Sequence, residues 1–390
     1  MPRLPILLLL AAIAPALTAQ NQATIDQMDQ LLGTLHGQKD AKVAEQLAAL
    51  ELTERASSAR LSKWQSDFRG ARTRQALAAL ADASVFFSPP AAELPANPPP
   101  DSATQKQILE RTVDYVRQTL PKLPNFLAQR ATTRFEVATR AQLDEQHQLQ
   151  LFQLRSANLD LTALGLVHGE HSNGSRLYYA GTWDTTVTYR DGHEVIDSSI
   201  THTGDRHPPP VGLSTEGEFG PILYVVLGDA IHSHIAWSHW EQGANGPLSV
   251  FRYEVPTDNS HYTVVSVQTG NTDFPAYHGE IAVDSATGAI ARISVESNET
   301  PPDPATESGI AVEYGPIVIG GITYNCPLRG VALSKAPSHE ATGTAKSSPV
   351  MVQTYLNDVS FTQYRIFRTE IRILPATPQT PATQPPPTDP

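Results

Sequence analysis

The segment Ile281-Ala-Val-Asp-Ser-Ala-Thr-Gly-Ala-Ile-Ala-Arg-Ile-Ser-Val295 carries the pattern that decides the fold. After the turn, apolar side chains alternate with Arg292 and Ser294, which is the period of a strand with one buried and one exposed face. Asp284 and Gly288 bound a run of small and polar residues typical of a tight turn. The segment therefore predicts two antiparallel strands joined as a hairpin.

The same signals recur along the second half of the chain. Gly320 and Gly321 separate two apolar runs, and Asp191-Gly192 is a type I′ hairpin signal. With further alternating segments, these signals predict roughly ten or more strands joined by short loops. Because strands twist, we expect a sheet of that size to curl into a half-barrel-like shape. The expected fold class is α+β, an N-terminal helical segment followed by a large curved antiparallel β-sheet with covering helices.

One helix is expected to interrupt the strands. It begins at Pro221, after Gly220, and proline is favoured at the first helical position. This helix is apolar over most of its circumference, so it needs an apolar partner surface. Placed against the concave side of a curved sheet, it predicts either a filled core or an apolar ligand pocket. The helix residues expected to line the pocket are Ile222, Leu223, Val226 and Leu227.

The chain before the sheet divides into two units. Residues 20–87 show the apolar spacing of helices, and Thr24 with Gln27 forms a capping-box pattern. Residues 88–101 form a Pro-rich linker, and such a chain stays extended. Ser102 is expected to cap a helix at the start of the β domain, residues 102–374. Residues 375–390 are expected to be a disordered Pro-rich tail.

Residues 1–19 have the organisation of a secretory signal peptide. Arg3 precedes an apolar run, and small residues at Ala16 and Ala19 precede a polar segment. The apolar run is shorter than the ~20 residues needed to cross a bilayer, and no longer run follows it. We therefore expect cleavage after Ala19, no transmembrane segment in the mature chain, and a periplasmic or secreted location.

Composition excludes several function classes. The chain has 390 residues and a net charge of −12, with 28 Lys and Arg against 40 Asp and Glu. A chain of this charge is unsuited to tracking nucleic-acid phosphates, so no nucleic-acid partner is expected. The single cysteine excludes an internal disulfide and a zinc site made of several cysteines. Because Gly-rich phosphate loops and other cofactor motifs are absent from the sequence, no cofactor is expected.

Several motifs carry a resemblance to known proteins. The motifs are Gly217-Glu-Phe-Gly-Pro-Ile-Leu223, Trp237-Ser-His-Trp-Glu-Gln242, Tyr277-His-Gly-Glu-Ile-Ala-Val-Asp284, Val312-Glu-Tyr-Gly-Pro316 and Leu356-Asn-Asp-Val-Ser-Phe361. With them, the chain resembles a family of uncharacterised exported proteins from soil bacteria.

A second resemblance is more remote. Tyr189-Arg-Asp-Gly192 and the hairpin of residues 283–293 are similar to the half-barrel of periplasmic lipoprotein carriers and lipoprotein-sorting proteins. That resemblance implies a concave apolar cavity for acyl chains. The chain departs from the carriers in its extra N-terminal helices, and it lacks an arginine motif that matches a carrier's functional residue.

Histidine clusters are candidates for metal chemistry. If they lie on a strand, His232 and His234 present two imidazoles on one face, and Asp229 completes a metal triad. A solvated histidine cluster is the simpler interpretation, and it applies also to His168 and His171 beside a turn.

Other reactive and aromatic side chains have mainly structural interpretations. Cys326 lies on the apolar face of a predicted strand, so we expect a buried and inert thiol. Glu216 and Glu218 are expected to solvate a Gly-rich loop rather than act as an acid and a base. Aromatic side chains either pack across strands or line a lipid cavity. The aromatic residues assigned to ligand binding are Trp237, Trp240, Tyr178 and Trp183.

Three functional hypotheses follow. The first is an exported, non-enzymatic binding protein that carries an apolar acyl-chain ligand or a lipoprotein in a concave β cavity. The second is a periplasmic scaffold or interaction protein with a solid β core, which recruits a protein partner through residues 20–87. The third is a metal-dependent hydrolase that uses His232 and His234. No catalytic residue is assigned.

Overall fold

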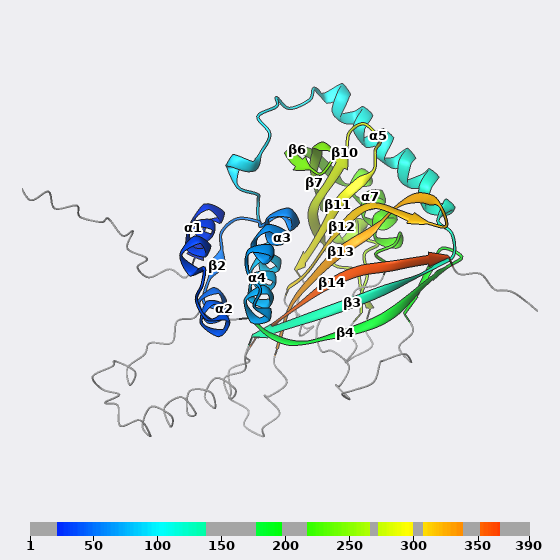
Figure 1. The fold of residues 1–390 in the computed structure, drawn as a ribbon. Coiled ribbons are helices and arrows are strands. Elements are labelled where there is room, and N and C mark those ends of the chain that lie inside the picture. Colours follow the sequence, from blue (N-terminus) through cyan, green and yellow to red (C-terminus); the bar gives the residue numbers. More distant parts are fainter. Residues whose placement is uncertain are drawn as a thin grey trace, which may run out of the picture.

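A mixed fold of helices and strands is built around one ten-stranded antiparallel sheet (Figure 1). The computed structural model describes residues 22–137, 177–196, 217–265, 272–298, 307–337 and 352–366. The predicted signal peptide, the predicted tail, His168, His171 and Glu216 lie outside the described residues.

In the part of the chain that the structure describes, the edge strands of the sheet do not pair with each other, so the sheet is open. The strand order is β5-β4-β3-β14-β13-β12-β11-β10-β7-β6, and all neighbouring pairs are antiparallel. The strands are β3 Phe126–Val137, β4 Leu177–Arg190, β5 His193–Ile196, β6 His234–Gly243, β7 Gly246–Val255, β10 Tyr277–Asp284, β11 Ile290–Asn298, β12 Glu307–Ile319, β13 Ile322–Pro337 and β14 Val352–Ile366. Two small sheets pair β1 Gln22–Ala23 with β2 Glu51–Leu52, and β8 Val264–Val265 with β9 Thr272–Asp273.

The predicted hairpins are confirmed. Asp191 and Gly192 join β4 to β5 with φ angles of 54° and 84°, as a type I′ turn requires. The turn that begins at Asp284 joins β10 to β11. Gly320 and Gly321, both with positive φ, join β12 to β13. Local turn chemistry therefore fixes the register of these strand pairs.

The predicted N-terminal helices are also confirmed. They are α1 Ile25–Leu35, α2 Asp40–Ala48, α3 Ser58–Asp67 and α4 Ala71–Ala83. Thr24 and Gln27 form the expected capping box at the start of α1. The apolar faces of the four helices share a core that includes Met28, Leu47 and Trp64. This unit, residues 22–87, is called the helical segment below.

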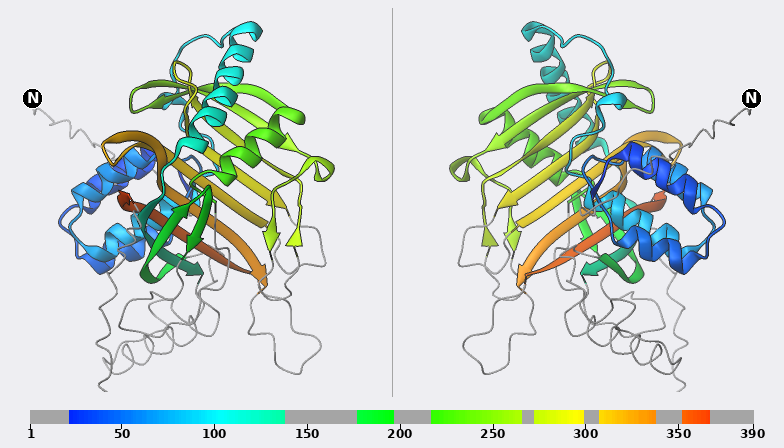
Figure 2. Two further views of the ribbon diagram at one scale, coloured as in Figure 1. Left: turned by 90° about the vertical axis from the view of Figure 1, so that its right-hand side faces the viewer. Right: turned by 90° about the vertical axis from the view of Figure 1, so that its left-hand side faces the viewer.

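The two faces of the sheet have different partners, as the two views of Figure 2 show. The face that carries Phe251, Ile281 and Val312 packs against α5 Ser102–Thr119 and α7 Pro221–His232 and is called the concave face. The face that carries Phe135 and Leu356 packs against α4 of the helical segment and is called the outer face. Figure 1 shows the strands curving around α7.

The segment between the helical segment and α5 differs from prediction in detail. Asp101, rather than Ser102, caps α5, and its side chain accepts a hydrogen bond from the Thr104 backbone N–H. Both residue types are good caps, so the sequence alone does not separate adjacent candidates. The predicted linker contains a short 3₁₀ helix, Ala91–Glu93, and the indole of Trp240 donates to the Pro98 carbonyl at 2.9 Å. The linker is therefore tied to β6.

Candidate functional site

Helix α7 lies against the concave face, where the sequence placed it. Its predicted ligand-binding residues are buried in the main core, and Val226 is 0% exposed. Their neighbours come from α5 and from the central strands of the sheet, including Ile281 and Val312. In the described residues, these predicted ligand-binding side chains of α7 are thus packed as core side chains. The four residues are Ile222, Leu223, Val226 and Leu227.

Polar contacts hold both ends of α7. Near its C-terminal end, Asp229 accepts hydrogen bonds from the Tyr277 hydroxyl at 2.8 Å and from the His261 backbone N–H at 2.8 Å. Burial and the Asp229 carboxylate raise the pKa of Tyr277, so its hydroxyl remains a donor. Just before the helix, the backbone carbonyl of Glu218 accepts from the Tyr314 hydroxyl at 2.9 Å.

The predicted metal ligands are separated. His232 is the last residue of α7 and His234 the first residue of β6, so the two imidazoles do not share a strand face. The Nδ1 atom of His232 lies 2.7 Å from the Gly228 carbonyl oxygen, and Asp229 is engaged by His261 instead. Over the described ranges, no three His, Cys, Asp or Glu side chains gather to hold a metal ion.

The aromatic residues assigned to ligand binding form two separate groups. Trp237 and Trp240 contact each other on β6, with ring centroids 4.9 Å apart, and Trp237 packs against Phe251 at 5.7 Å. Tyr178 and Trp183 lie on β4, near the opposite edge of the sheet. One small ligand therefore cannot contact both groups.

Buried arginines interrupt the concave face on β3. The guanidinium of Arg130 lies 5.9 Å from the ring centroid of Phe361, and that of Arg134 lies 5.0 Å from that of Tyr355. Together with Thr132 between them, these arginines are called the basic stripe; all three side chains are buried. Sequence reasoning missed the stripe, although its members share the strand phase of the buried Phe126.

Glu218 and Cys326 give one correction and one confirmation. Glu218 was expected to solvate a loop, but it is 2% exposed and pairs with Arg130 at 3.4 Å. The loop packs inward because the next residue, Phe219, fills an aromatic cluster on the concave side. Cys326 is fully buried as predicted, and burial raises its pKa to about 12.

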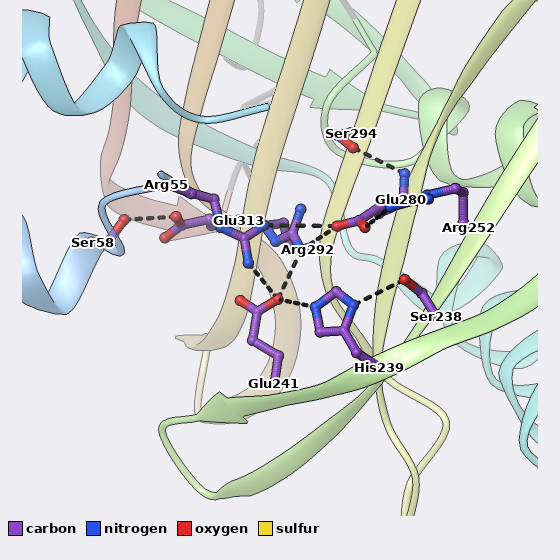
Figure 3. A network of polar contacts seen from close by, with 10 residues as sticks. All are labelled: Arg55, Ser58, Ser238, His239, Glu241, Arg252, Glu280, Arg292, Ser294 and Glu313. Atoms are coloured by element: carbon purple, nitrogen blue, oxygen red, sulfur yellow. Dashed lines mark hydrogen bonds and ion pairs between the residues drawn. The ribbon is translucent and has the colours of Figure 1, made fainter. Parts of the chain in front are cut away.

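A charge network joins the helical segment to the outer face (Figure 3). Arg55, which precedes α3, lies 2.6 Å from Glu241 on β6 and 3.8 Å from Glu280 on β10. Arg292 on β11 lies 2.9 Å and 3.2 Å from the same two carboxylates. Burial alone raises the pKa of Glu241, but Arg292, the His239 imidazole 3.8 Å away, and Arg55 hold it well below its usual range. The network therefore remains ionised.

Arg292 corrects a prediction of the sequence. Its alternation with apolar residues placed it on a solvent-facing side of the strand, but Arg292 is buried. The alternation is as predicted, but the helical segment covers the polar side of β11, which the pattern predicted to face solvent. Periodicity identifies the two faces of a strand and does not reveal a distant segment that packs on the polar one.

A second group of ion pairs lies farther along the same interface. Arg329 on β13 pairs with Asp82 of α4 and lies 3.0 Å from Asp358. Ser58 donates to Glu313 at 2.6 Å. Burial raises the pKa of Asp82 to about 8, with Asp358 adding to the shift and Arg329 opposing it. Ionisable groups are thus buried along the whole contact.

A groove lies between the helical segment and the outer face. Its volume is about 450 Å³. Most of its wall is apolar, and it includes Leu47, Leu80, Phe86, Phe87 and Leu333. Glu51 and Lys335 contribute charged groups. This helix–sheet groove was not predicted, because residues far apart in the sequence form it.

No helix in the described residues is both long and apolar enough to span a membrane. Comparison with protein-family models, with curated proteins and with solved structures finds no match to the chain.

Proposed function

We propose that the protein is an exported, non-enzymatic binding protein that holds the acyl chain of a lipid or lipoprotein against the concave face. The sheet acts as a half-barrel, and α5 and α7 cover it. One observation carries this proposal: α5 and α7 pack on the concave face mainly through contacts between apolar side chains. The remote resemblance of residues 189–192 and 283–293 to lipoprotein carriers supports the same ligand class.

An acyl chain can replace the contacts that α7 makes with the sheet. Apolar contacts have no directional requirement, so a chain inserted between helix and sheet exchanges one apolar neighbour for another. Each methylene group removed from water contributes about 0.8 kcal/mol. Because Leu223 and Val226 are buried beneath the helix, α7 must move away from the sheet before the chain enters.

The anchor at Asp229 controls this movement. Replacing Asp229 by asparagine removes the charge that strengthens its hydrogen bonds with Tyr277 and His261. The helix then opens more often. Since apparent affinity scales with the fraction of binding-competent protein, the variant binds ligand faster and more tightly.

The test is a titration of delipidated protein with a fluorescent fatty acyl probe. Wild-type protein binds saturably, Asp229→Asn binds with a higher association rate, and Leu223→Glu loses binding while circular dichroism reports its folding. Tyr224→Ala is the matched control, because Tyr224 is on the same helix but 65% exposed. Absence of saturable binding by both wild type and Asp229→Asn contradicts the proposal.

A scaffold or interaction protein with a solid β core is the second candidate. The close packing of α7 favours it, and the helix–sheet groove offers apolar walls to a protein segment with apolar side chains. The same titration separates the two candidates, since a solid core binds no acyl probe even when Asp229 is replaced. The described residues give the metal-dependent hydrolase no ligand set, because Asp229 bonds to His261 and Tyr277 instead of meeting His232 and His234.

A further inference from the structure

The basic stripe of β3 has no role in burying an acyl chain. Arg130 and Arg134 share the concave side with the apolar Phe126 and Ala128. A guanidinium removed from water is unfavourable unless acceptors surround it. Two buried arginines on a largely apolar face therefore require acceptors, and their partners differ.

Arg130 is paired within the protein. Its Nη2 atom lies 3.4 Å from the Glu218 carboxylate, and Glu218 is itself buried. This pair connects β3 to the loop before α7. Arg130 is therefore assigned a structural role.

Arg134 is incompletely satisfied. It is 4% exposed, and its buried Nε and Nη2 atoms have no hydrogen-bond acceptor among the described residues. Glu136 approaches Nε at 3.1 Å, which gives an ion pair without a hydrogen bond. Burial lowers the pKa of Arg134, and Glu136 opposes that shift. The guanidinium, packed over the Tyr355 ring, is thus a buried cation with donors to spare.

We infer that Arg134 binds the anionic head group, a carboxylate or a phosphate, of a ligand whose acyl chain lies on the concave face. This inference rests on the proposed function and names the class of ligand. The planar fork of arginine matches both anions, and such charge-assisted hydrogen bonds are about twice as strong as neutral ones. From Ala128 to Arg134 the strand extends roughly 20 Å, which is the length an acyl chain must span to reach the apolar start of β3 from a head group at Arg134.

The experiment compares three ligands of one chain length on the full chain: a fatty acid, the corresponding alcohol and the corresponding alkyl phosphate. Each displaces the fluorescent acyl probe. Wild-type protein binds at least one of the two anions roughly tenfold to a hundredfold more tightly than the alcohol. Arg134→Met lowers affinity for that anion by the same factor and leaves the alcohol unchanged. Arg190→Met, on the exposed end of β4, is the matched control and changes neither.

A second variant keeps the inference testable if Arg134→Met does not fold. Glu136→Gln removes the carboxylate that competes for Arg134 and is expected to raise affinity for the anions only. The stronger of the two anions identifies the head-group chemistry. Equal binding of alcohol and anions by wild type, or discrimination that survives Arg134→Met, overturns the head-group assignment while the proposed function stands. Failure of all three ligands to bind both wild type and Asp229→Asn overturns both.

Discussion

Replacement of Arg55 by methionine removes a cation that two buried carboxylates share. Arg55 is 5% exposed and contacts Glu241 and Glu280, which then have Arg292 as their main remaining cation. Removing one partner of a buried ion pair costs roughly 3–5 kcal/mol, because the other partner keeps its charge without water. Arg292 still offsets part of that charge, so we expect the lower end, about 3 kcal/mol.

Urea unfolding measures this loss of stability. The midpoint, the urea concentration at which half of the protein is unfolded, should fall. The slope of the unfolding free energy against urea concentration should stay constant, as it does when only stability changes. Adding Glu241→Gln to Arg55→Met leaves one cation, Arg292, beside one anion, Glu280. The double variant should therefore lose at least ~1 kcal/mol less stability than the two single variants lose together. Arg190→Met, an exposed control, should leave the midpoint unchanged. Additive losses would refute the shared network.

Three further predictions concern the interior. Burial raises the pKa of Asp82 from 3.8 to about 8, so between these pH values the folded protein binds more protons than the unfolded chain, and its stability falls as pH rises. Urea unfolding at several pH values should show a flatter slope of stability against pH for Asp82→Asn, and an unchanged slope argues against the raised pKa. Gly279→Ala should reduce the free energy of unfolding by about 2–3 kcal/mol, because the added Cβ overlaps the backbone carbonyl of Ser294. The melting temperature should fall accordingly, and an unchanged melting temperature contradicts this prediction. The buried Cys326 should react with a thiol reagent only in denaturant, and rapid labelling of native protein would show an open core.

Local signals predicted much of the fold. The hairpin turn at Asp191-Gly192 and the capping box at Thr24 depend on neighbours in the chain, so their residue types suffice to identify them. The end of α7 was harder to place, because His232 and His234 fit either a strand or a helix–strand boundary until the helix is seen to continue through His232. The predicted metal triad required His232 and His234 to lie on one strand.

Packing between segments that are distant in the chain could not be predicted from the sequence. Arg292 has the neighbours of an exposed strand position, and Arg55 has none that suggest an ion pair. Both are buried because the helical segment packs on the outer face. The phase of Arg134 with Phe126 was readable, but whether that side of β3 is buried depends on the curvature of the sheet and on segments distant in the chain.

The two faces of the sheet differ in the kind of contact that covers them. On the outer face, Arg55 forms ion pairs with Glu241 and Glu280, and moving the helical segment away would leave these buried carboxylates without that partner. On the concave face, the apolar side of α7 loses only contacts that an acyl chain can restore, and the Asp229 contacts hold one end of the helix. A movement that admits a ligand is therefore less costly at α7 than at the helical segment. On β3 of the same face, the buried donors of Arg134 are free to bind the one part of an acyl ligand that apolar contacts cannot.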